Sequence, residues 1–140
     1  MNLMLAAAAV LAMATGVVHS VLGERLIFRR LRRGSLVPTV PAPPLQERHT
    51  RILWASWHLV SVLGWVMASI LWRLAGDRDS ALSVDGLLNV MAGGFFAGSL
   101  LVLVATRARH PGWIALGAIA VLVWLHSRGQ ASIAGPSLAS

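Results

Sequence analysis

The chain has 140 residues, of which 56% are hydrophobic and only 12% are charged, and its mean hydropathy is +0.71. A soluble domain of this size could not hide so much apolar surface, so the composition excludes the soluble globular class. The formal charge of +7 comes entirely from arginine, and cysteine is absent. Disulfides, thiolate catalysis and cysteine-ligated metal centres are therefore excluded. No nucleic-acid partner is expected, because the sequence lacks a basic face on a soluble element.

Four apolar segments approach the length of about 20 residues that a helix needs to cross the hydrocarbon core of a bilayer. The first ten residues carry no arginine, so the first segment is predicted to be a retained helix and not a cleaved signal peptide. We predict an all-α, four-helix transmembrane bundle that forms a single membrane domain over residues 1–140. Its helices are expected at about residues 3–22, 52–72, 86–106 and 112–126.

Arginine is distributed unevenly between the two sides of the predicted membrane domain. Loop 24–51 and the turn after the third segment carry nine arginines, whereas the other side carries three, diluted by aspartates. The positive-inside rule then places the arginine- and proline-rich loop 24–51 in the cytoplasm and both termini on the non-cytoplasmic side. This loop is also expected to contact anionic lipids of the bilayer, although orientation alone explains its charge.

Two histidines lie inside predicted spans, where ionisable residues are costly and usually mark a site. His19 and His58 fall at similar depths on antiparallel neighbouring helices. Such a pair can hold a haem iron from both sides, and the planar guanidinium groups of Arg25 and Arg51 could pair with the haem propionates. We predict a haem b site with His19 and His58 as metal ligands, in an electron carrier or redox accessory protein.

The same histidines allow other interpretations, namely interhelical hydrogen bonding, a different metal, or a proton or ion path. A non-haem metal centre has poor geometry, because Glu24 lies about 140° around the helix from His19. A cation-coupled transporter is disfavoured, because no acidic residue falls inside the four predicted spans. No catalytic residue is predicted, because Ser56, Ser61 and Ser69 are helical surface positions with no aspartate in reach of a histidine. The competing function is a non-catalytic accessory or assembly subunit of a larger membrane complex.

Small residues predict where helices meet. Gly16 on the first helix and the Gly94 to Gly98 GxxxG motif on the third should allow close approach of neighbouring helices. Such faces could bind a membrane-protein partner or a second copy of the chain. Asn89 is expected to form an interhelical hydrogen bond. No role is assigned to the remaining histidines, which are His49, His110 and His126.

Three stretches resemble a group of small bacterial inner-membrane proteins with four predicted transmembrane helices and no assigned activity. They are Gly16-Val-Val-His19-Ser-Val-Leu-Gly-Glu-Arg25, Arg51-Ile-Leu-Trp-Ala-Ser-Trp-His58 and Arg109-His-Pro-Gly-Trp113. The likeness covers most of the chain, from Ala12 to Val123. It implies the bacterial inner (cytoplasmic) membrane and the same four-helix layout, and it implies no cofactor, substrate or reaction.

Overall fold

The computed structural model describes residues 1–76 and 83–133, and these residues form four long α-helices and one short 3-10 helix. Each of the four α-helices is long and apolar enough to cross a membrane. The predicted all-α, four-helix transmembrane fold is therefore confirmed, and the chain is a multi-pass membrane protein. The elements are α1 (Leu3–Leu26), η1 (Phe28–Leu31), α2 (Glu47–Ala75), α3 (Val84–Thr106) and α4 (Gly112–Ile133).

The helices extend beyond the predicted spans at both ends of the arginine-rich loop and at the end of α4, which reaches Ile133 where residue 126 was predicted. α1 ends at Leu26 where residue 22 was predicted, and α2 begins at Glu47 where residue 52 was predicted. Hydropathy marks the part of a helix that suits hydrocarbon, whereas backbone hydrogen bonding continues into polar sequence. The predicted loop 24–51 is consequently shorter, and Glu24 belongs to the last turn of α1.

Polar residues set several of the helix ends. The side chain of Asn2 accepts hydrogen bonds from the backbone N–H groups of Met4 and Leu5, and Ser83 caps α3 by accepting from Gly86. These bonds satisfy donors that the first turn of a helix leaves without partners. At the other end of α3, Arg107 adopts a left-handed conformation, with φ of 51°, and its N–H returns to carbonyls of the last turn.

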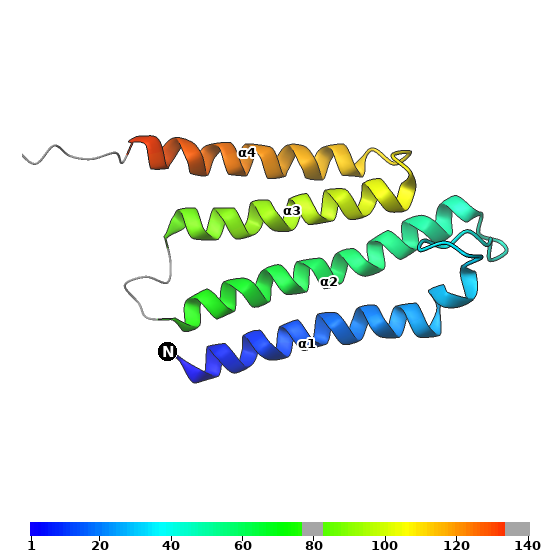
Figure 1. The fold of residues 1–140 in the computed structure, drawn as a ribbon, viewed down its shortest axis with the longest axis horizontal. Helices are drawn as coiled ribbons and strands as arrows, with labels where there is room; N and C mark the ends of the chain where they lie inside the picture. The colour runs from blue at the N-terminus through cyan, green and yellow to red at the C-terminus, as the bar shows by residue number, and fades with distance from the viewer. Residues whose placement is uncertain (77–82, 134–140) are drawn as a thin grey trace, which may run out of the picture.

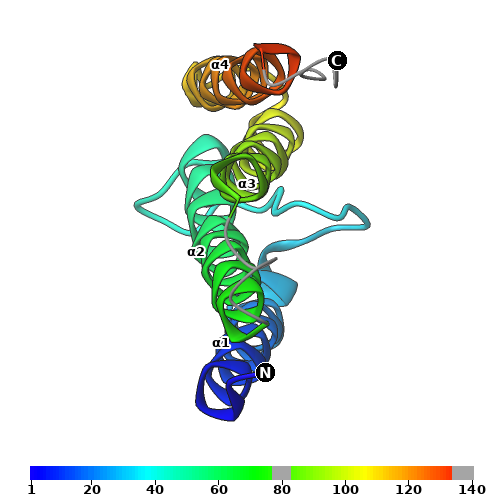
Figure 2. The ribbon, with the colours of Figure 1, turned by 90° about the vertical axis from the view of Figure 1, so that its left-hand side faces the viewer.

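The four helices form an open row in which each packs mainly against its neighbours in the sequence. Figure 1 shows the alternation of direction along the row, and the end-on view in Figure 2 places α1 and α4 at its two edges. The backbone N–H of Asn2 donates to the carbonyl of Ala75 at 2.7 Å, which aligns the start of α1 with the end of α2. The α1–α2 pair is therefore an antiparallel hairpin with a large mutual interface.

Both arginine-rich connections, residues 27–46 and 107–111, lie at the same end of the row (Figure 1). The buried core at this end combines Phe28 and Val37 from the first connection with side chains of α2 and α3. This packing holds the connection against α2 and α3. Which end faces the cytoplasm is set by the arginine count and stays a prediction.

Glycines allow close contacts where the sequence predicted them. A Cβ atom added at Gly16 would lie 2.5 Å from the indole nitrogen of Trp65, and one at Gly94 would lie 2.2 Å from a methyl group of Val66. A side chain at either position would push α2 away from its neighbour. The adjacent Gly93 instead has no atom within 4 Å of its added Cβ, so it offers a matched control position.

Candidate functional site

A cluster of polar side chains joins α1 to α2 near the arginine-rich end of the hairpin. Ser20 and Glu24 are four residues apart on α1, and Trp54 and His58 are four apart on α2, so each pair lies on one helix face. The hairpin brings these two faces together. His58 Nε2 lies 2.9 Å from Glu24 Oε1, and His58 Nδ1 lies 2.9 Å from Ser20 Oγ. Both ring nitrogens of His58 are therefore bonded to α1.

The carboxylate of Glu24 is the centre of this cluster. It accepts hydrogen bonds from the indole N–H of Trp54 and from the guanidinium of Arg32, in addition to its contact with His58. Arg32 reaches the carboxylate because η1 turns the chain immediately after α1 ends. The side chains of Glu24, His58 and Arg32 are 27%, 13% and 22% exposed. A largely buried carboxylate is tolerated here because three donors replace its hydration.

Hydroxyl groups extend the cluster deeper along the hairpin. Ser20 Oγ lies 2.8 Å from Ser61 Oγ, and Ser61 is buried. A serine hydroxyl has one proton and two lone pairs, so Ser20 can donate to one neighbour while accepting from the other. The hydrogen-bonded chain therefore runs from Glu24 through His58 and Ser20 to Ser61. We call Ser20, Glu24, Arg32, Trp54, His58 and Ser61 the Glu24 cluster.

His19 lies beside the cluster without joining it. Its ring stacks on Trp57, with centroids 4.3 Å apart and planes 8° from parallel, and its backbone carbonyl accepts from the Trp57 indole at 3.0 Å. His19 Nε2 is buried and has no hydrogen-bond partner among the described residues. Trp57 in turn lies directly over Gly23 of α1. His19 thus contributes mainly packing to the helix pair.

The predicted arginine partners of haem occupy different surroundings. Arg51 is buried, and its Nε donates to the backbone carbonyl of Ala105 at 2.6 Å, where the last turn of α3 leaves carbonyls without helical partners. Arg25 is exposed on the last turn of α1. The two guanidinium groups therefore lie in unlike environments, one against α3 and one open to the surroundings.

The described side chains do not fit a haem held between His19 and His58. Ligation by His58 through either nitrogen would require breaking its bond to Ser20 or to Glu24, and ligation by His19 would use a ring packed flat on Trp57. Among the described residues, no group of three or more histidine, aspartate or glutamate side chains could hold a metal ion. The haem assignment stays a prediction from sequence, and the arrangement favours a structural role for the polar groups.

Glu24 was missed as a site residue because it lies beyond the predicted end of the first span. Ser20 was likewise not predicted as a site residue, although Ser20, His58 and Glu24 are in consecutive contact. The four-residue spacings of Ser20 with Glu24 and of Trp54 with His58 could have revealed the two matching faces. Nucleophilic catalysis is still disfavoured, because Ser20 lies within α1, whose backbone amides are used by the helix and leave no oxyanion hole.

The other polar candidates serve the fold. Ser127 on α4 donates to Asn89 on α3 at 3.4 Å, which supports the expected interhelical hydrogen bond, although Asn89 is exposed. His49 belongs to the cap at the start of α2, and the Nδ1 of His110 accepts from the backbone of Gly112. His126 is exposed on α4.

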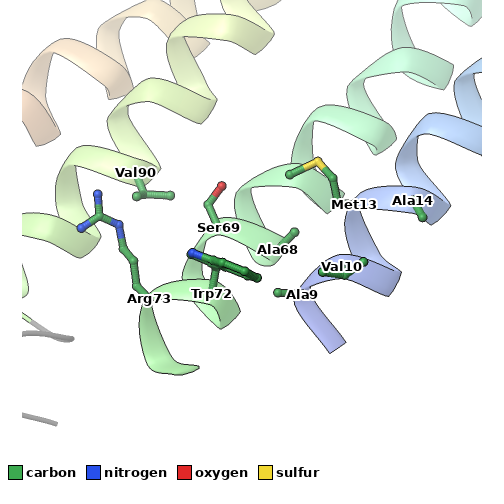
Figure 3. A pocket seen from close by; sticks show the side chains of 9 residues that line it. All are labelled: Ala9, Val10, Met13, Ala14, Ala68, Ser69, Trp72, Arg73 and Val90. Carbon is green, nitrogen blue, oxygen red and sulfur yellow. The ribbon is translucent and has the colours of Figure 1, made fainter. Parts of the chain in front are cut away.

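An apolar groove lies away from the Glu24 cluster, toward the opposite end of the row. It has a volume of about 720 Å³, and Figure 3 shows side chains of α1, α2 and α3 around it, with Arg73 at one side. Small side chains, those of Ala9, Ala14 and Ala68, form part of its walls. None of the described residues that line this groove is a histidine or an acidic residue, which separates it from the polar site.

Comparison with known proteins gave no match: no protein-family model, no curated protein and no solved structure is similar to the chain. Function is therefore inferred from the residues and their geometry.

Proposed function

We propose that the protein is a non-catalytic accessory or assembly subunit of a larger complex in the bacterial inner membrane. The observation that carries this proposal is that the polar groups of the hairpin are bonded to one another. His58 uses both ring nitrogens, and Glu24 accepts from three donors. Groups bonded in this way stabilise a helix pair and are not free to bind a substrate or a cofactor.

The open row supports the same proposal. A closed bundle covers its own polar groups and leaves only an outer surface, whereas a row of four helices leaves two broad faces and two edge helices for neighbours (Figure 2). α1 and α4 each pack against one neighbour in the row, so either can receive a helix of a partner or of a second copy. Contact of the arginine-rich connection with anionic lipids would hold such an assembly at the membrane surface.

Haem-dependent electron transfer is the competing function, and one observation favours it. His19 Nε2 is buried without a partner among the described residues, and such an atom can bond a ligand. Ligation of a haem iron by both histidines would still require His58 to give up its bond to Ser20 or to Glu24. The two functions predict different properties of the purified protein.

A visible spectrum combined with native mass spectrometry in nanodiscs distinguishes the two functions. We expect a colourless protein that is recovered in a defined stoichiometric assembly with another integral membrane protein or with further copies of itself. A Soret band that disappears in both His19→Ala and His58→Ala would establish haem ligation and overturn the proposal. A single chain recovered alone would equally contradict it. His126→Ala, at the exposed histidine of α4, is the matched control for the spectrum.

A further inference from the structure

A second polar region lies at the arginine-rich end, where the start of α2 meets the connection from α3 to α4. It is a cavity of about 520 Å³ between the start of α2 and the connection from α3 to α4. We call it the arginine cavity. The charged and titratable residues that line it are Glu47, Arg48, Arg51, Arg107, Arg109 and His110.

The arginine cavity carries a large excess of positive charge. Four guanidinium groups face one carboxylate, that of Glu47, which lies 3.4 Å from Arg51 and 4.0 Å from Arg107. The guanidinium of Arg109 has no hydrogen-bond or ion-pair partner among the described residues, and the Arg107 side chain is 60% exposed. The cavity can therefore gain stability from an anion with several oxygen atoms, which planar guanidinium groups recognise with paired hydrogen bonds.

The backbone directs the two loop arginines toward the cavity. Arg107 and Ala108 both adopt the left-handed conformation, with φ of 51° and 61°, which is unfavourable for residues other than glycine. This turn ends α3 and presents Arg107 to Glu47 on α2. Backbone strain of this kind is often found where a fold positions functional side chains.

A second apolar groove, separate from the one beside Arg73, continues from the arginine cavity along the helices. The groove, of about 280 Å³, shares Ile52, Thr106 and His110 with the cavity. Beyond these shared residues its walls are mainly apolar side chains of α2, α3 and α4, namely Ala55, Leu59, Val102, Ala115 and Leu116. A charged cavity that opens into an apolar groove has the two parts of a phospholipid site, one for the headgroup and one for an acyl chain.

We propose that the arginine cavity and the adjoining groove form a specific site for one anionic phospholipid, with the phosphate among the arginines and an acyl chain between α2 and α4. Basic pockets between transmembrane helices are known to bind anionic headgroups. This site is distinct from general attraction of the arginine-rich loop to the membrane surface, because Arg107 and Arg109 belong to the other connection. It does not depend on the proposed accessory function.

Native mass spectrometry of the full-length protein in detergent tests the site. The probes are phosphatidylglycerol, phosphatidylcholine with the same acyl chains, and inorganic phosphate. We expect one phosphatidylglycerol per chain in preference to phosphatidylcholine. The double variant Arg107→Gln and Arg109→Gln should weaken phosphatidylglycerol binding about 10- to 30-fold, given the contribution of each arginine to binding of anionic lipid.

Two controls separate the site from its alternatives. The double variant Arg29→Gln and Arg30→Gln removes the same charge from exposed positions on η1 and should leave binding unchanged. Ala115→Trp, which fills the groove, should weaken lipid binding without affecting inorganic phosphate. Equal losses in the two arginine pairs, or an intact lipid affinity in Ala115→Trp, would overturn the proposal. If the double variant Arg107→Gln and Arg109→Gln does not fold, the single variant Arg109→Gln provides the same test.

Discussion

Replacing Glu24 by alanine should lower the free energy of unfolding by about 2 to 3 kcal/mol, because the change leaves buried donors without an acceptor. His58, Trp54 and Arg32 all direct hydrogen atoms at this carboxylate. Two of these donors are on α2 and the third follows η1, so their loss also loosens the contact of α1 with α2 and with the connection after η1. Unfolding in mixed micelles, followed by tryptophan fluorescence, measures the effect.

Glu47→Ala is the matched control for this variant. Glu47 is 42% exposed and pairs with Arg51 at 3.4 Å, so its removal should cost less than about 1 kcal/mol. An effect of Glu24→Ala no larger than that of Glu47→Ala would contradict the assignment of Glu24 as the centre of the polar cluster. The loss of unfolding free energy in Glu24→Gln should lie between the losses in Glu24→Ala and Glu47→Ala, because glutamine keeps one acceptor oxygen but removes the charge.

Gly23→Ala should destabilise the protein by about 1 to 3 kcal/mol through overpacking of the hairpin. The added Cβ would lie 2.1 Å from Trp57 Nε1 and 2.6 Å from Trp57 Cε2. The indole cannot move easily, because it stacks on His19 and donates to the His19 carbonyl. A single methyl group should therefore separate α1 from α2.

Gly93→Ala tests the same change where space is free. No atom lies within 4 Å of a Cβ added at this position of α3, and alanine is favoured over glycine in a helix by about 1 kcal/mol. The Gly93 variant should be as stable as the natural protein or slightly more so in the same micelle assay. Equal stability of the two alanine variants would mean that Trp57 does not press on Gly23.

The four membrane spans could be predicted from the sequence because burial in lipid requires long apolar segments, and hydropathy measures that requirement directly. Glu24 shows where this reasoning stops. It follows an apolar segment, so it was assigned to the loop, although α1 continues to Leu26 and places it against His58. Helix ends depend on backbone hydrogen bonds and tertiary partners, neither of which hydropathy detects.

The two histidines were recognised as intramembrane polar groups, but their partners could not be predicted from depth alone. Depth matches His19 with His58, whereas the rotation of α2 against α1 determines which side chains touch. That rotation follows from the contact of Trp57 with Gly23, which directs His58 toward Ser20 and Glu24. Arg51 similarly depends on the position of α3, whose last turn it bonds.

A double-mutant cycle between Glu24 and His58 tests most directly whether the polar groups of the hairpin are bonded to one another. The variants Glu24→Gln, His58→Gln and their combination should give a coupling free energy of about 1 kcal/mol, typical of bonded neighbours in a membrane protein. The cycle of Glu24→Gln with His19→Gln should be close to additive, because no bond joins that pair among the described residues. Additive effects for Glu24 and His58, within about 0.3 kcal/mol, would contradict the contact on which the proposed function rests.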